Sequence, residues 1–79
     1  MTKPELLDHL ARVGDADAHE VAEVFGLLYP SAAMALLRLT RQGLVVRRLD
    51  PESAMYWYTL TEVGEKRLAY FRSLEDAAS

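Results

Sequence analysis

Apolar residues recur at helical spacing at the start of this chain of 79 residues. The pattern over residues 3–13 predicts an amphipathic helix, because its apolar positions fall on one side of a 3.6-residue turn. Thr2 and Glu5 have the spacing of a capping box before this helix, and Gly14 can close it. The residues that we expect this helix to bury are Leu6, Leu7, Leu10 and Val13.

Two further helices are predicted on either side of a turn at Gly26. The second helix follows Asp17, which can cap it, and is expected to bury Val21, Val24 and Phe25. The third helix begins near Pro30, whose fixed φ suits a first turn, and runs to about Gln42. Its expected core positions, again at helical spacing, are Ala32, Ala35, Leu36 and Leu39.

After Gly43 the apolar period changes from helical to alternating. Residues 44–49 predict a strand, residues 50–53 a turn and residues 55–60 a returning strand. The alternation assigns the two faces of the second strand. The inward face is expected to hold Tyr56, Tyr58 and Leu60, and the outward face Met55, Trp57 and Thr59.

A last helix is predicted over residues 62–76, with Thr61 as its cap. Gly64 lies inside it and costs about 1 kcal/mol relative to alanine, which is tolerable where it permits close approach to the sheet or to another helix. The apolar face of this helix is wide enough to contribute both to the core and to a subunit interface. Its residues are Val63, Leu68, Tyr70, Phe71 and Leu74.

The order of helix, helix, helix, two-stranded hairpin and helix defines the predicted fold class. It is α+β and mostly α: a winged helix-turn-helix forming a single domain over residues 1–79. Three segments resemble MarR- and PadR-type regulators: Val21-Ala22-x-x-Phe25-Gly26-Leu27, Leu36-x-x-Leu39-x-x-x-Gly43-Leu44-Val45-x-Arg47-Arg48, and Tyr58-Thr59-Leu60-Thr61-Glu62-x-Gly64.

The resemblance implies double-stranded DNA as the partner and a role as a small transcriptional regulator. In this family the early turns of the third helix face base edges and the wing presses basic residues on the backbone. The wing positions are Arg47 and Arg48. The positions of the third helix are Tyr29, Pro30, Ser31, Ala33, Met34, Leu37 and Arg38.

Charge is distributed in agreement with that role. The whole chain has a formal net charge of −3, but residues 29–60 have a net charge of +2, and the segments on either side are net negative. Four arginines give the middle segment its charge, and we expect them to converge beside the third helix. They are Arg38, Arg41, Arg47 and Arg48. A solvated surface without a partner is the alternative interpretation of these arginines.

The third helix departs from the family pattern, because Ala33 and Met34 stand where polar or basic side chains are expected. Apolar groups can contact thymine methyls but cannot supply a base-reading code alone. Exposed Met34 and Leu37, with Trp57, would instead suit a protein partner. The alternative function is therefore a winged-helix protein-interaction module that does not bind DNA. Acidic Asp50 and Glu52 at the wing tip would repel phosphate if the tip reached a minor groove.

Other chemistry is not indicated. The chain has no cysteine and no nucleotide-binding or triad motif, so we expect no enzyme, cofactor or small-molecule substrate. His9 and His19 are predicted to lie at the surface or near caps rather than to bind metal, and Asp15 and Asp17 are interpreted as caps. No apolar run reaches the length of a membrane span, so a cytoplasmic protein is expected. Regulators of this kind bind as homodimers, which here would use the first and last helices.

Overall fold

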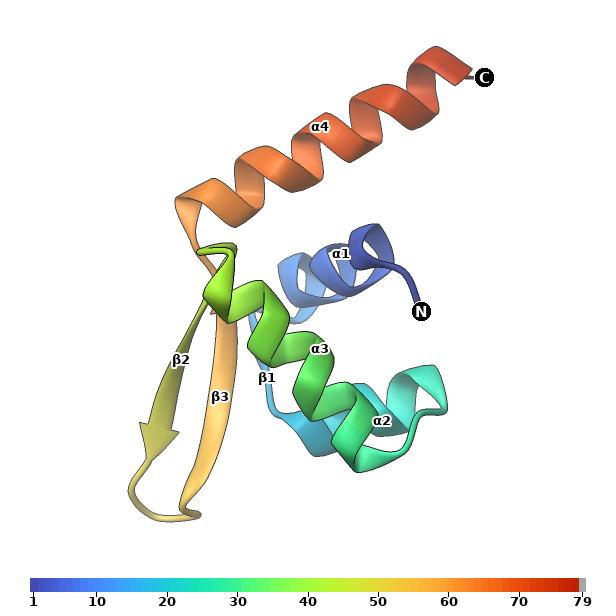
Figure 1. The fold of residues 1–79 in the computed structure, drawn as a ribbon. Coiled ribbons are helices and arrows are strands. Elements are labelled where there is room, and N and C mark those ends of the chain that lie inside the picture. The colour runs from blue at the N-terminus through green and yellow to red at the C-terminus, as the bar shows by residue number, and fades with distance from the viewer. Residues whose placement is uncertain (79) are drawn as a thin grey trace.

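The sequence folds as a winged helix-turn-helix, and the predicted fold class is confirmed (Figure 1). A computed structural model describes residues 1–78. Within them the elements follow in the order α1 (Lys3–Val13), β1 (Asp15–Ala16), α2 (Ala18–Phe25), α3 (Tyr29–Arg41), β2 (Val45–Asp50), β3 (Met55–Leu60) and α4 (Glu62–Ala78). The predicted helices and hairpin are present, with ends displaced by one or two residues where helices and strands ordinarily fray.

The helix starts arise from local capping, as the sequence indicated. The Thr2 hydroxyl accepts a hydrogen bond from the Glu5 N–H at 3.3 Å, and an Asp17 carboxylate oxygen accepts one from the Glu20 N–H at 2.8 Å. Gly26 ends α2 with φ of 64°, a left-handed conformation that suits glycine. These local contacts fix where α1 and α2 begin and where the turn before α3 is made.

The strands form one antiparallel sheet in the order β1-β3-β2, and the hairpin of β2 and β3 is the wing. Strand β1 was not predicted, and Asp15, interpreted as a cap, instead pairs with Thr59. The Thr59 hydroxyl also donates to the Gly14 carbonyl at 2.8 Å. A two-residue strand is too short to show a periodicity in the sequence, which is why it was not predicted. It forms by pairing with residues more than forty positions away.

The core lies between the three N-terminal helices, the sheet and the start of α4. Three residues expected to be buried are exposed. Val13 is the last residue of α1, Val24 (53% exposed) lies off the arc of α2 that holds Val21 and Ala22, and Tyr56 (43%) is on the part of the wing beyond the core. The buried apolar residues are Leu6, Leu7, Leu10, Ala16, Ala18, Val21, Ala22, Ala32, Leu36, Leu39, Leu44, Val45, Tyr58 and Leu68.

The base of the wing holds the start of α4. The Thr61 hydroxyl donates to the Gly43 carbonyl at 2.6 Å and accepts from the Gly64 N–H at 3.0 Å, so its predicted role as a cap is confirmed. Gly64 packs directly on the backbone of Leu44, where a Cβ atom would collide with the Leu44 carbonyl. The glycine inside this helix therefore allows the close approach to the sheet that the sequence suggested.

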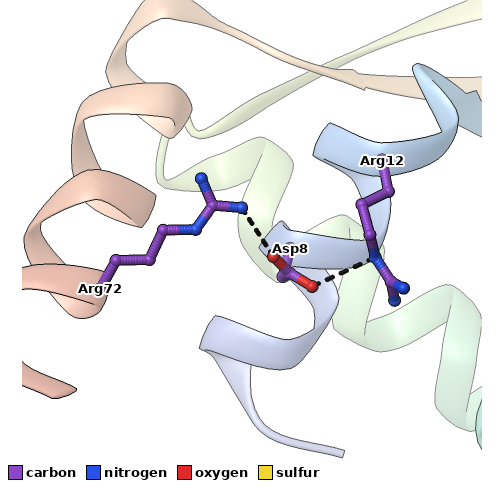
Figure 2. Close-up of polar contacts among 3 residues, drawn as sticks. All are labelled: Asp8, Arg12 and Arg72. Atoms are coloured by element: carbon purple, nitrogen blue, oxygen red, sulfur yellow. Dashed lines mark hydrogen bonds and ion pairs between the residues drawn. The ribbon is translucent and has the colours of Figure 1, made fainter. Parts of the chain in front are cut away.

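Beyond its first turns, α4 extends along α1 and past the body of the domain (Figure 1). Leu68 is buried, whereas Tyr70 and Leu74 are exposed. Asp8 of α1 links the two helices, since its carboxylate contacts Arg72 at 2.7 Å and Arg12 at 3.2 Å (Figure 2).

In the described part of the chain, no single helix has the length and apolar character needed to cross a membrane. Helices α2 and α3 reach the necessary length and hydrophobicity only when they are taken together, and that pair is bent by 115°.

Candidate nucleic-acid interface

One side of α3 is open to solvent along its whole length. Ala32, Leu36 and Leu39 face the core, as predicted, and Ala35 is partly buried. The opposite face is formed by residues three or four positions apart, which stand above one another on a helix. Its exposed residues are Pro30, Ser31, Met34, Arg38 and Arg41, whereas Ala33 and Leu37 are half-buried.

The start of α3 packs against α2 and lies near the wing. The Tyr29 ring lies against the His19 ring, with centroids 4.4 Å apart. Both residues line a surface hollow of about 280 Å³ whose far side is formed by Tyr56 and Tyr58 of β3. Tyr29 is therefore at the junction between the exposed helix and the inward face of the wing.

Arg47 lies on this same side of the wing. Its guanidinium stands over the Tyr56 ring, 4.3 Å from the ring centroid. Tyr56 in turn lines the hollow that contains Tyr29. Arg47 is thus directed to the side of the wing that adjoins α3, and ring contact limits the freedom of its side chain.

Arg48 lies on the other face of the wing, because successive residues of a strand point to opposite sides. It pairs with Trp57 and lines a hollow with Asp15 and Asp50. Trp57 is half-buried there, on the outward face predicted for it. The four arginines therefore do not converge on a single surface as expected: Arg47 adjoins α3, and Arg48 is directed away.

The arginines of α3 and the wing are nonetheless free of carboxylate partners. Within residues 1–78, no ion pair includes Arg38, Arg41, Arg47 or Arg48. The paired cations are elsewhere: Arg12 and Arg72 contact Asp8, and Lys66 contacts Glu62 at 3.5 Å. The exposed guanidinium groups around α3 are therefore available to an anionic partner.

Lys3 joins this basic region through the fold, and sequence analysis missed it. Its ammonium group donates to the Gln42 side-chain oxygen at 2.8 Å, at the end of α3. Lys3 also lines a hollow together with Arg38. The two contacting residues are 39 positions apart, so neither helical period nor local charge could have indicated the contact.

A family model describes most of this arrangement. The model of the MarR family matches residues 2–54, which include the helix-turn-helix and the first strand of the wing. The chain belongs to the MarR family. No curated protein compared with the chain matches it significantly.

Solved structures agree with this MarR-family assignment at the level of fold. YusO from Bacillus subtilis superposes with a TM-score of 0.91 at 18% identity, over 96% of this chain and 55% of YusO. Apo MarR from E. coli gives 0.83 at 19% identity, over 91% and 54%. An S. aureus MepR mutant bound to an oligodeoxyribonucleotide gives 0.85 at 22% identity, over 96% and 57%. The MarR-family chain spans about half the length of these proteins.

The acidic wing tip of this MarR-family chain is organised by hydrogen bonds. The Asp50 carboxylate accepts from the Glu52 N–H at 3.0 Å and from the Ser53 hydroxyl at 2.9 Å. These bonds, the backbone one foremost, lower the pKa of Asp50 below its ordinary value. Asp50 is thus ionised and bonded within its own turn, whereas Glu52 is exposed.

The two histidines of the MarR-family chain have different surroundings. His19 is exposed, but the surface position predicted for His9 is wrong, since His9 is only 6% exposed. Its ring meets Phe25 edge to face with centroids 5.6 Å apart, and its Nε2 stands 3.9 Å from a Glu20 oxygen, too far for a hydrogen bond. Within the described residues, no three ligand-type side chains are grouped for a metal.

Proposed function

We propose that this chain is the DNA-binding part of a MarR-family transcriptional regulator. In the proposed complex, α3 enters the major groove of double-stranded DNA and the wing lies on the sugar-phosphate backbone. The observation that carries the proposal is the set of unpaired arginines around the exposed face of α3. The structural likeness to a MepR mutant bound to an oligodeoxyribonucleotide gives further support.

The side chains of the exposed face have separate roles in this proposal. Arg38 and Arg41 offer planar donor groups to phosphate or to guanine, and Ser31 can bond to either. Met34 and the half-buried Ala33 can contact thymine methyl groups. Tyr29 and Pro30 hold the start of the helix at the groove. The proposed activity is therefore binding, with base reading that combines few polar and several apolar contacts.

The wing contributes backbone contacts through Arg47. Its guanidinium lies over Tyr56, on the side of the wing that adjoins α3, and this position supports a contact with the DNA backbone that borders the groove. Arg48, beside Asp15 and Asp50, makes the weaker contribution. Phosphate contacts of this kind orient a protein on DNA without reading sequence.

Dimerisation is part of the same proposal. Tyr70 and Leu74 are exposed on α4, the helix that extends along α1 and past the body of the domain (Figure 1). A two-fold pairing through α1 and α4 would present two α3 helices to palindromic half-sites. Sedimentation equilibrium tests it: Leu74→Asp should lower the association constant, whereas Val63→Asp, also exposed on α4, should not. Equal masses for wild type and L74D would refute this interface.

The cytoplasm is the proposed location of the protein.

The function is tested by fluorescence anisotropy with a labelled random duplex at 50 and 200 mM salt. Three or four phosphate contacts per protomer predict an affinity lower by about 40- to 150-fold at the higher salt, because each neutralised phosphate releases counterions. Absence of duplex binding at 50 mM would overturn the proposal. A protein-binding role for the apolar part of α3 would then be the remaining candidate.

A further inference from the structure

A hollow of about 220 Å³ lies between the start of α1 and the end of α3. Thr2, Lys3 and Leu6 form one side of it, and the other side includes Arg38 and Gln42. The Lys3 ammonium group reaches across to the Gln42 side-chain oxygen at 2.8 Å. The amide thereby holds the ammonium group of a residue from α1 beside the last turn of α3.

The hollow is basic. Among the described residues, its lining contains Lys3 and Arg38 and no carboxylate. The hollow between α1 and α4 is different, since Glu5, Asp8 and Glu75 line it with Arg72. The Lys3–Arg38 hollow therefore favours a bound anion, because its two positive charges are not neutralised by a carboxylate in its lining.

The hollow also lies on the flank of α3 opposite the wing. In Figure 1 the wing and α1 are seen on different sides of α3. On the α1 side, Ala35, Arg38 and Gln42 line the hollow, whereas Tyr29 is directed to the hollow beside Tyr56 of the wing. A helix with side chains is about 10–12 Å wide and fills a major groove of about 12 Å, so each flank of the helix meets a phosphate backbone.

We propose that Lys3 and Arg38 form a phosphate-binding site for the DNA backbone on the flank of α3 remote from the wing. The site rests on the proposed function and adds a contact from α1, outside the helix-turn-helix and the wing. Gln42 is a positioning residue that keeps the Lys3 ammonium group beside Arg38. With Arg47 on the other flank, the site holds α3 between the two strands that border the groove.

The test is the salt dependence of duplex binding by Lys3→Ala. Loss of one phosphate contact should reduce the slope of log affinity against log salt by about 0.9, so that affinity changes about 3.5-fold less between 50 and 200 mM salt. Lys3→Arg should keep the wild-type slope. Lys66→Ala is the matched control, because Lys66 is an exposed lysine of α4 paired with Glu62. Circular dichroism confirms that each variant is folded.

The outcomes separate this site from the function on which it rests. An unchanged slope for K3A, with a slope reduced by Arg47→Ala, would overturn the Lys3 site and leave the proposed function intact. Failure of the wild-type protein to bind duplex at 50 mM salt would overturn both. An equal reduction for K3A and K66A would also refute the site, since it would reflect net charge alone.

Discussion

The guanidinium of Arg47 stands 4.3 Å above the centre of the Tyr56 ring, whereas its neighbour Arg48 lies on the opposite face of the same strand. A cation over an aromatic face is held by the ring quadrupole, a contact worth about 0.5–1 kcal/mol at an exposed site. The contact keeps Arg47 on the side of the wing that adjoins α3. In the proposed complex, these two adjacent arginines therefore have unequal access to DNA.

This difference predicts unequal effects of the two alanine substitutions. Arg47→Ala should reduce the salt slope of duplex binding by about 0.9, and Arg48→Ala by clearly less, because Arg48 lies beside Asp15 and Asp50. Anisotropy titrations at several salt concentrations measure both slopes. Equal slopes for the two variants would show that the face of the wing does not decide the contact.

Substitution of Met34 distinguishes DNA binding from a protein-binding role. Met34 is 45% exposed at the centre of the open face of α3. Met34→Lys should strengthen binding to random duplex several-fold at 50 mM salt, because the added charge would lie in the groove. Val63→Lys, at a similarly exposed position on α4 (54%), is the control and should change affinity less. Weaker or unchanged binding by M34K would argue against α3 as the groove helix.

Gly64→Ala should destabilise the domain. The added Cβ would collide with the Leu44 carbonyl, which belongs to the backbone and cannot move aside without shifting the base of the wing. Overpacking of this kind costs about 1–3 kcal/mol of unfolding free energy. Urea unfolding followed by circular dichroism measures it. Glu65→Ala, at the next and exposed position, should stay within about 0.5 kcal/mol of wild type. Wild-type stability in G64A would refute the close contact.

The Asp8 ion pairs predict a pH-dependent contribution to stability. The hydrogen bond from Arg72, together with the charge of Arg12, lowers the pKa of Asp8 below its ordinary value (Figure 2). Because the folded-state pKa is the lower one, the contribution is complete above the unfolded pKa of about 3.9 and is lost as pH falls through the folded pKa.

Thermal unfolding of Asp8→Asn checks this sign. The variant should melt below wild type at pH 7, and the difference should shrink towards pH 3 as the wild-type carboxyl becomes protonated. Glu23→Gln removes an exposed carboxylate outside these ion pairs and serves as the control. A difference that is the same at pH 7 and pH 3 would contradict the ion-pair explanation.

The sequence by itself determined the helices, the hairpin and their order. Thr2, Asp17 and Thr61 cap helices through hydrogen bonds to residues three positions on, and Gly26 turns the chain through its own backbone conformation. Such contacts involve only near neighbours, so their residue types can be recognised without a fold. The core arc of α3 was predicted for the same reason, because helical period alone sets it.

Only the tertiary structure decided which of these residues share a surface. Strand β1 exists through its pairing with β3, the ring of the buried His9 meets Phe25 of α2, and Lys3 reaches Gln42 across 39 positions. The period of a strand separates Arg47 from Arg48, but the packing of the wing beside α3 decides which of the two adjoins α3. Contacts between distant segments depend on how whole elements pack, and no local pattern of residues encodes that packing.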